Sequence, residues 1–346
     1  MTESMKKPVV VIPNLNGGKD LLEAVASLQK QTLQPHIIIV DNASTDDSAA
    51  RAVEKFPGIE LIVHSQNLGY AGGVNPGFLR AIELGAAYVA PFNDDATADA
   101  GWLEALVDFL GSHPRYGSVA CKVLKDDKKT IDSTGDYVTT WGLPYPRGRG
   151  EADRGQYDTT GENGICDIFA ASGAASLYRV EALRKVGLLD EDFFAYYEDV
   201  DLGFRMQLAG WKVGYEPRSL AYHKIGMTSG RIKGFTTMQT LKNLPLLIYK
   251  NVPLRYLPTV AVRYMLAEAL FFGRACLRGQ MVAALKGFGK GRLLLLKKIP
   301  KRWDIQRSRT VSDKYIWRSL VHDLPPNAHA LRKLRMKWWG LLGRRI

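Results

Sequence analysis

VVVIPNLNGG, at residues 9–18, is the stretch that decides the fold of this 346-residue chain. A second stretch, HIIIVDNASTDDS at residues 36–48, repeats its pattern. Both begin with a nearly unbroken run of β-branched residues, which is typical of strands buried on both faces of a parallel sheet. Residues 19–31, between the two runs, carry Leu and Val at helical spacing. This succession predicts an α/β fold with a doubly wound, mostly parallel sheet.

The alternation of strands and helices continues to about residue 95. Residues 44–56 (STDDSAARAVEKF) predict a helix with Ser44 or Thr45 as its N-cap. Gly-, Arg- and Tyr-rich sequence over 111–164 predicts a region made mainly of loops. Three further segments predict a strand, a helix and a strand: IELIVH at 59–64, NPGFLRAIELG at 75–85 and AAYVAPFNDD at 86–95.

Polar residues follow each predicted strand at its carboxyl end. The first strand runs into PNLNGG, the second into DNASTDD, the third into SQNLGYAGG and the fourth into NDDA. Ligands of open α/β sheets bind at this edge. Neither the dinucleotide pattern Gly-x-Gly-x-x-Gly nor a Walker loop follows the first strand, so neither of these phosphate-binding motifs is predicted.

Charge divides the chain into two parts, and we take 1–230 and 231–346 as separate domains. Residues 1–230 hold 22 Lys and Arg against 31 Asp and Glu, a net charge of −9, whereas 231–346 hold 25 against 4, a net charge of +21. Apolar residues mix with Lys and Arg at helical spacing in the second part, which predicts a basic, mainly helical region. Nucleic acid or an anionic membrane surface are the partners that such a charge favours.

Cysteine usage and hydropathy indicate a reducing compartment and no membrane span. The three cysteines are odd in number and widely spaced, which argues against a disulfide framework or a zinc site. The best candidate for a span, 257–273, is interrupted by Arg263 and Glu268. The apolar run at 9–12 is too short for a signal peptide. We therefore expect a cytoplasmic protein, soluble or peripheral on the inner face of the cell membrane.

Seven motifs, taken in order, make a specific resemblance. They are VVIPNLNG, IIIVDNASTDDS, NLGYAGGVNPG, FNDD, ASGAASLYR, FFAYYEDVDLGFRMQLAGW and AYHK. The chain resembles an inverting family 2 glycosyltransferase with the GT-A fold, and is most similar to rhamnosyltransferases and galactofuranosyltransferases of bacterial cell-surface polysaccharide assembly. The resemblance covers about residues 8–230. It implies nucleotide-sugar binding by residues 1–110, and acceptor binding and catalysis by 111–230.

The stretch FFAYYEDVDLGFRMQLAGW, residues 193–211, places three acids directly after an aromatic run. A helix start is the structural alternative, because acids in a first turn meet unpaired N–H groups. The resemblance implies that Asp199 is the general base that takes the acceptor's proton, with Asp201 as the second candidate. Apolar surroundings would raise the pKa of such a carboxyl group. The residues expected to support the base or the acceptor side are Glu198, Asp201, Arg205 and Trp211.

The acids of FNDD and the histidine of AYHK are the metal ligands that the resemblance implies. Asp95, at the Asp-x-Asp position of the family, would bind a divalent cation, Mg²⁺ or Mn²⁺, and His223 would complete the shell. Asn93 stands where the family has an acid, so we expect weaker or water-mediated contact there. The residues expected to bind the nucleotide-sugar are Pro13, Asn14, Asn16, Asp41, Asn67, Gly69, Asn93 and Asp94.

The resemblance implies a metal-dependent, inverting transfer of a sugar from a nucleotide-sugar to a lipid-linked or polysaccharide acceptor. Rhamnose from dTDP-rhamnose is the first choice, and a UDP-linked galactofuranose, GlcNAc or other hexose is the alternative. The Gln-x-x-Arg-Trp motif of processive members is absent, because Ile299 stands at the Gln position before Arg302 and Trp303. We therefore expect a non-processive enzyme.

Three other functions are compatible with parts of the sequence. A nucleotidyltransferase would need a basic Gly-rich loop after the first strand, where only Lys19 is present. A non-catalytic nucleic-acid-binding protein would need a recognisable reading module, which we do not find, so we expect no nucleic-acid partner. A catalytically inactive scaffold of the same fold is disfavoured by Asp95, Asp199 and His223.

The basic part of the chain predicts a membrane-surface contact. Residues 241–303 place Leu, Phe and Tyr among Lys and Arg at helical intervals, as segments that lie on anionic lipid do. RKLRMKWWGLLGRRI, at 332–346, repeats the pattern with Trp338 and Trp339 as interface anchors. A helical cap on the catalytic domain or a homo-oligomer contact is the alternative.

Overall fold

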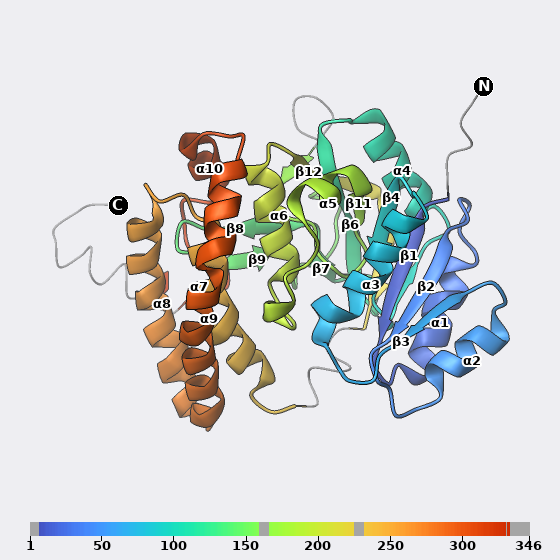
Figure 1. Cartoon of the computed structure of the whole chain (residues 1–346), viewed down its shortest axis with the longest axis horizontal. Helices are drawn as coiled ribbons and strands as arrows, with labels where there is room; N and C mark the ends of the chain where they lie inside the picture. The colour runs from blue at the N-terminus through green and yellow to red at the C-terminus, as the bar shows by residue number, and fades with distance from the viewer. Residues whose placement is uncertain (1–6, 159–165, 225–231, 330, 333–346) are drawn as a thin grey trace. The chain divides into compact units, whose positions relative to one another are not determined.

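The computed structural model describes residues 7–158, 166–224, 232–329 and 331–332. The chain forms two compact units, which we describe separately (Figure 1). The first unit combines residues 1–136 with 146–232, and the second combines 137–145 with 233–346.

The first unit is built on a ten-stranded mixed sheet. Its strands are β1 (Val9–Asn14), β2 (His36–Asp41), β3 (Glu60–Val63), β4 (Tyr88–Pro91), β5 (Ala96–Ala98), β6 (Tyr116–Lys125), β7 (Ile131–Ser133), β10 (Cys166–Ile168), β11 (Leu177–Arg179) and β12 (Lys212–His223). The order is β10-β12-β6-β11-β4-β1-β2-β3, with β5 on β12 and β7 on β6. Strands β4, β1, β2 and β3 run parallel, as do β6 and β12, and the antiparallel β11 joins these two parts.

Helices cover both faces of this sheet, as the near-continuous apolar strands predict. Val10 and Ile12 of β1 belong to the core cluster on one face, and Val9 and Val11 to the cluster on the other. Side chains of a strand alternate between faces, so a strand covered on both sides must be apolar throughout. The helices are α1 (Gly18–Leu28), α2 (Ser48–Lys55), α3 (Gly69–Glu83), α4 (Trp102–Ser112), α5 (Val180–Val186) and α6 (Glu198–Leu208), with a 3₁₀ turn η1 at Glu191–Phe193.

The expectation that 111–164 is mainly loop is wrong for its first part. Residues 116–125 form β6, a ten-residue strand between β12 and β11 in which only Lys125 is not buried. Small residues such as Gly117 weaken the strand pattern of this sequence, yet they are needed there. A side chain at Gly117 would lie 3.0 Å from the Cβ of Trp211. Pairing with β12 and close packing, rather than local propensity, make this segment a strand.

The expected N-cap of α2 is also wrong. The helix begins at Ser48, with Asp47 at the cap position. The Ser44 hydroxyl instead donates to Asp41 Oδ1 at 2.5 Å and accepts from Asn14 Nδ2 at 3.0 Å. Ser44, predicted as a helix cap, therefore links the carboxyl ends of β1 and β2 by hydrogen bonds.

The second unit is mainly helical, as its sequence predicts. Among its described residues, Glu268 accepts a hydrogen bond from Tyr264 and pairs with Arg292 at 2.5 Å. No described helix is both long enough and apolar enough to cross a membrane. Trp338 and Trp339 lie outside the described residues. The helices are α7 (Phe235–Asn251), α8 (Leu257–Leu277), α9 (Met281–Ser308) and α10 (Asp313–Ser319), and a two-stranded sheet pairs β8 (Asp136–Val138) with β9 (Pro144–Pro146).

Candidate active site

The carboxyl ends of β1 and β2 lie side by side, because Asn14 and Asp41 are opposite each other in register. The buried Asn14 amide donates to Asp41 Oδ1 at 2.8 Å. Asn16 follows with a φ of +56°, and its side-chain oxygen accepts a hydrogen bond from the Thr45 N–H at 2.7 Å. Three residues expected to bind the nucleotide thus lie in one hydrogen-bonded group.

The loop after β3 is attached to this group by Asn42, a residue that the sequence analysis did not single out. Asn42 Nδ2 donates to Asn67 Oδ1 at 3.2 Å and to the Gly69 carbonyl at 2.9 Å. Gly69 has a φ of +73°, and a side chain there would overlap the carbonyl oxygen of Phe194. Only glycine fits this position. Pro13, in β1, and Asn42 both lie close to Gly73 of α3, since a side chain there would meet the Cβ of Pro13 at 3.2 Å and Asn42 Nδ2 at 3.3 Å.

The segment Asn93-Asp94-Asp95 leaves the sheet after β4 and passes beneath the first loop. Asp94 Oδ2 accepts a hydrogen bond from the Leu15 N–H at 3.3 Å. Burial, and then the charge of Asp95, raise the pKa of Asp94 to about 7. Asp94 therefore lies close to the predicted nucleotide loop, whereas Asp95 faces another partner.

That partner is His223, the last residue of β12. Its Nε2 lies 3.0 Å from Asp95 Oδ1 and 3.1 Å from Asn93 Nδ2. Its Nδ1 lies 3.0 Å from Asp132 Oδ2. Burial alone would lower the pKa of His223, but the hydrogen bonds to Asp132 and Asp95 raise it to about 9. The two predicted metal ligands, Asp95 and His223, are thus in direct contact although they are far apart in the sequence.

Asp199, in the first turn of α6, is held by two backbone N–H groups. Its Oδ2 accepts from Gly173 at 2.9 Å and its Oδ1 from Val200 at 2.8 Å. Burial raises the pKa of Asp199, and these hydrogen bonds oppose the shift only in part. The residue stays partly accessible. A reachable carboxyl group with a raised pKa can accept a proton from a bound hydroxyl.

One short backbone segment joins Asp199 to the FNDD acids. Gly173 donates to Asp199, and the carbonyl of its neighbour Ala174 accepts from the Asn93 N–H at 3.0 Å. The Tyr70 hydroxyl donates to the Gly173 carbonyl. A side chain at Gly173 would lie 2.9 Å from that hydroxyl, which explains the small residues of the ASGAAS turn. Asp199 and Asn93, the residue before the two FNDD acids, are therefore hydrogen-bonded to adjacent residues.

The aromatic run before Asp199 is a strained turn. Phe194, Tyr196 and Tyr197 have φ values of +63°, +70° and +73°. Each such residue costs on the order of 1–3 kcal/mol, and such strain is concentrated at functional sites. The Phe194 carbonyl accepts from the Ala71 N–H at 3.3 Å, which connects the turn to α3. The turn thus sets where the first turn of α6 begins.

Asp201 and Arg205 form a buried ion pair rather than part of an open acceptor surface. Arg205 Nε lies 2.9 Å from Asp201 Oδ2. The same guanidinium donates to the carbonyls of Val186, Gly187 and Leu188 at 2.6, 2.9 and 2.7 Å. These bonds fasten α6 to the segment after α5. We therefore assign the pair to the support of α6, and keep Asp199 as the candidate base.

The other two residues expected to support the site lie in different places. Glu198 is buried at the start of α6. Glu198 directly precedes Asp199, and after burial its charge raises the pKa of Tyr70, whose hydroxyl donates to the Gly173 carbonyl. Trp211 lies close to Gly117 beyond the other end of α6, and it is partly buried against a core cluster. The structure thus brings Glu198 to the site but not Trp211.

The sequence of the chain matches a known protein family. The model of glycosyl transferase family 2 matches residues 9–187, which is just over half of the chain. The chain belongs to glycosyltransferase family 2. The match contains the loops after β1 and β2 and the FNDD acids, and it ends before Asp199 and His223.

Two relatives and one solved structure are similar to this family 2 glycosyltransferase. An N-acetylglucosaminyl-diphospho-decaprenol L-rhamnosyltransferase of Mycobacterium tuberculosis is 30% identical over 241 residues, 65% of this chain and 78% of the relative. The galactofuranosyltransferase GlfT1 of Mycolicibacterium smegmatis is 28% identical over 199 residues, 56% of this chain and 62% of the relative. The mannosyltransferase PcManGT of Pyrobaculum calidifontis, solved with GDP-Man and Mn²⁺, has a TM-score of 0.53 and 17% identity, covering 90% of this chain and 84% of that one. The expected GT-A fold and a glycosyltransferase activity are thereby confirmed.

The ligands that this family 2 glycosyltransferase offers fit a hard divalent cation. Asp95 supplies carboxylate oxygen, His223 supplies Nε2, and the buried Asn93 Oδ1 accepts no hydrogen bond from any described residue. An unpaired buried oxygen beside an acid and an imidazole suits Mg²⁺ or Mn²⁺. Among the described residues no group of three or more His, Cys, Asp and Glu side chains is arranged to hold a metal ion. The described residues thus offer part of a metal shell.

Two further acids and an arginine lie close to residues of the candidate site, and the sequence analysis did not single them out. Asp132 contacts His223, and Arg149 Nη2 contacts Asp132 at 2.9 Å. Burial, and then the charge of Asp199, raise the pKa of Asp136 to about 8. All three lie in the region predicted to be loop, where no local pattern marks them. Asn42 alone could have been found, because it follows Asp41 in the VDNAS motif.

Proposed function

We propose that this enzyme is an inverting, non-processive glycosyltransferase that moves a sugar from a nucleotide-sugar to a lipid-linked or polysaccharide acceptor. Rhamnose from dTDP-rhamnose is the first choice, and UDP-linked galactofuranose, GlcNAc or another hexose is the alternative. The rhamnosyltransferase and galactofuranosyltransferase relatives support this class of donor. The observation that carries the proposal is the attachment of Asp199 and of the Asn93–Asp95 segment to the adjacent residues Gly173 and Ala174.

Asp199 is the base in this proposal. The acceptor oxygen forms a bond to the anomeric carbon while the bond from that carbon to the diphosphate oxygen breaks, and the electron pair leaves with the diphosphate. The proton of the acceptor hydroxyl passes to the Asp199 carboxylate. Attack opposite the leaving group inverts the anomeric configuration. The N–H groups of Gly173 and Val200 keep the carboxylate in one orientation for this transfer.

Asp95 and His223 would hold a divalent cation, with Asn93 Oδ1 beside them. When bound there, such a cation stabilises negative charge on the departing diphosphate. The Mn²⁺ of the mannosyltransferase structure supports this assignment. The hydrogen-bonded group of Asn14, Asn16 and Asp41 would hold the nucleoside, because it is rigid before the donor arrives and its loops follow the carboxyl ends of β1 and β2.

Release of free nucleotide from a panel of dTDP- and UDP-sugars, with and without Mn²⁺ or Mg²⁺ and with bacterial lipid extract as acceptor, tests this function. We expect turnover of one donor, lost on chelation of the metal, and at least a hundredfold slower in Asp95→Ala. Asp47→Ala is the matched control, because the Asp47 side chain is 72% exposed and lies outside the site. Turnover that is indifferent to chelation would contradict the metal assignment, and turnover of no donor would contradict the function.

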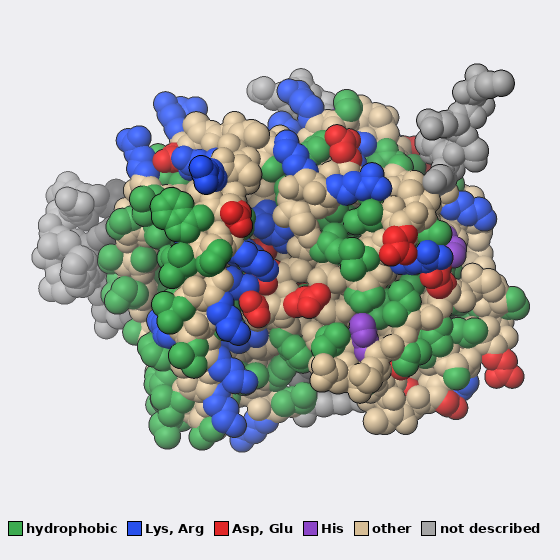
Figure 2. Space-filling view, in the orientation of Figure 1, with side chains coloured by type: hydrophobic (Ala, Val, Ile, Leu, Met, Phe, Trp, Pro, Cys, Tyr) green, Lys and Arg blue, Asp and Glu red, His purple; other side chains and the backbone are tan. Residues whose placement is uncertain are grey.

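We also propose that the second unit attaches the enzyme to an anionic membrane surface on the inner face of the cell membrane. Helix α9 carries exposed Met281, Leu285, Leu296 and Trp303 at intervals that place them along one stripe. Val262, Met265, Leu266 and Leu277 are similarly exposed on α8. Figure 2 shows hydrophobic side chains gathered over these helices and a row of Lys and Arg beside them.

Charge favours lipid over a second copy of the chain as the partner of this face. Exposed Lys286, Lys290, Lys297 and Lys301 form a separate row on α9, spaced by four and seven residues. A symmetric dimer through this face would bring like charges together, whereas anionic head groups would neutralise them. Each basic residue near such a surface contributes about 1 kcal/mol.

Co-sedimentation with phosphatidylglycerol-containing liposomes tests the membrane contact. We expect the double variant Leu277→Asp, Leu285→Asp to bind liposomes at least tenfold more weakly, because both side chains would otherwise lie among lipid. We expect the triple variant Lys286→Ala, Lys290→Ala, Lys297→Ala to bind them about a hundredfold more weakly. Leu79→Asp is the matched control, since Leu79 is 52% exposed, as Leu285 is, but lies in the first unit. Equal binding by all variants, or a concentration-dependent dimer with no lipid binding, would overturn the proposal.

A further inference from the structure

We propose that Asp132, held in turn by Arg149, is a positioning residue that fixes the imidazole of His223 with Nε2 directed at Asp95. The inference rests on the metal site of the proposed function and adds residues that neither the family motifs nor the comparisons point to. Asp132 touches neither Asp95 nor, in this proposal, the donor. It acts through the ring of His223.

The contact between Asp132 and His223 leaves little freedom to the ring. Asp132 is 2% exposed, and its Oδ2 lies 3.0 Å from His223 Nδ1. The same carboxyl group lies between the imidazole of His223 and the guanidinium of Arg149, two groups that pair with a carboxylate. A carboxylate accepts hydrogen bonds and cannot donate, so Nδ1 must carry the proton. With Nδ1 committed to Asp132, Nε2 is the ring nitrogen left to bind a cation, and it lies on the side of Asp95.

Arg149 keeps the Asp132 carboxylate in place by two contacts. Its Nη2 lies 2.9 Å from Asp132 Oδ1, and its Nε donates to the Asp132 carbonyl at 3.0 Å. One carboxylate oxygen thus forms an ion pair with Arg149 without a hydrogen bond, and the other contacts His223. The Arg149 side chain is 53% exposed, so its charge is partly screened and its role is chiefly geometric.

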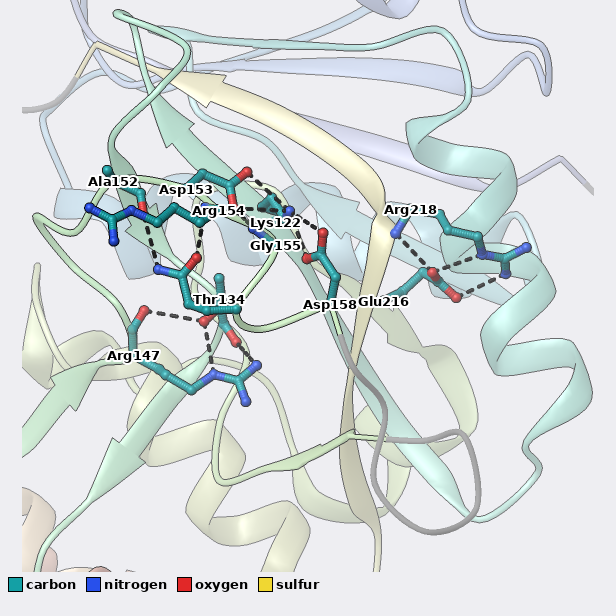
Figure 3. A network of polar contacts seen from close by, with 11 residues as sticks. Lys122, Thr134, Arg147, Ala152, Asp153, Arg154, Gly155, Asp158, Glu216 and Arg218 are labelled. Carbon is teal, nitrogen blue, oxygen red and sulfur yellow. Dashed lines mark hydrogen bonds and ion pairs between the residues drawn. The ribbon is translucent and has the colours of Figure 1, made fainter.

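The segment that carries Arg149 is itself tied to the sheet at both of its ends. At the first end, Arg147 Nε donates to Thr134 Oγ1 at 2.8 Å. At the other, the buried Lys122 of β6 pairs with Asp153 at 3.1 Å and with Asp158 at 2.7 Å (Figure 3). Backbone bonds between Ile131 and both Gly150 and Glu151 lie between these ties. The position of Arg149 opposite Asp132 is therefore set by the fold and not by a mobile side chain.

Mn²⁺ titrated into the full-length chain, followed by calorimetry and by the electron paramagnetic resonance of free Mn²⁺, tests the inference without an activity assay. We expect Asp132→Ala to weaken Mn²⁺ binding about 10- to 100-fold, the range found when partners of a metal-bound histidine are removed. Asp132→Asn keeps an acceptor oxygen and should lose less. Arg149→Ala should lose less than Asp132→Ala, because it removes only the support of the carboxylate.

A double-mutant cycle separates positioning from a general effect of charge. In the His223→Ala background, Asp132→Ala should leave Mn²⁺ affinity unchanged within about twofold, since there is no ring left to position. A further tenfold loss in that background, or wild-type affinity in folded Asp132→Ala, would overturn the inference alone. Glu216→Gln, which breaks an ion pair with Arg218 on the same strand as His223, is the control and should bind Mn²⁺ as the wild type does. Absence of Mn²⁺ binding by the wild type would overturn both the metal site and this inference.

Discussion

Asp199→Asn is expected to slow sugar transfer by about 10²- to 10⁴-fold, the range that a positioned general base contributes. Asparagine keeps the size of the side chain but cannot take the acceptor's proton. Folding should be preserved. Burial raises the pKa of Asp199, so above the pH at which an unfolded aspartate ionises its charge opposes folding, and the neutral amide removes that cost. The measurement is the rate of transfer at saturating donor, beside a urea unfolding curve.

The pH dependence of the wild-type transfer rate is a second test of the role of Asp199. Asp199 must be ionised to act, so the rate should fall as the pH drops through its pKa. Because burial raises that pKa, the fall should occur above the ordinary aspartate range near about 4. Glu181→Gln, an exposed position on α5, is the control for both measurements and should match the wild type. A variant Asp199→Asn that retains a tenth of the wild-type rate would remove Asp199 from the role of base.

Asp201→Ala, two residues further along α6, is expected to act on stability instead. The substitution leaves the Arg205 guanidinium buried without its counter-charge, which costs about 3–5 kcal/mol of unfolding free energy. Since whole domains are stable by only about 5–15 kcal/mol, this loss should be evident as a large shift of the urea midpoint. The change would be followed by far-ultraviolet circular dichroism.

Two comparisons test the reason for that loss. Replacing both partners, as Asp201→Leu with Arg205→Met, should destabilise less than Asp201→Ala alone, because no buried charge is left unpaired. Asp47→Ala breaks a pair with the same i,i+4 spacing to Arg51, but both side chains are more than half exposed, so it should change the free energy by less than about 1 kcal/mol. An Asp201→Ala protein as stable as the wild type would show that the pair does not hold α6.

Residues 9–95 of the fold were predictable because their signals are local. Strands buried on both faces must be apolar, so the apolar runs Val9–Ile12 and Ile37–Val40 can be recognised as strands from the sequence. Segment 116–125 was not predictable in this way. Its small residues are required by the packing of Trp211 and by the pairing with β12, and neither partner is visible in the strand's own sequence.

The residues of the candidate site also differ in whether a local sequence pattern marks them. Asn14, Asp41, Asn67, Asp95, Asp199 and His223 were proposed from motifs, because each stands in a short pattern next to a strand or helix end. Asp132 and Arg149 have no such pattern. They reach the site because the segments 129–134 and 147–153 pair with each other beside His223.

The sequence by itself determined the alternation of strands and helices over residues 9–95 and the family, and it predicted the edge of the sheet at which ligands bind, because periodicity and motifs are properties of neighbouring residues. Only the tertiary structure decided which acids work together. It separated Asp199, bonded to Gly173, from Asp201, paired with Arg205, although both lie in one helical turn. Neighbouring positions on a helix face different directions, and their partners come from distant parts of the chain.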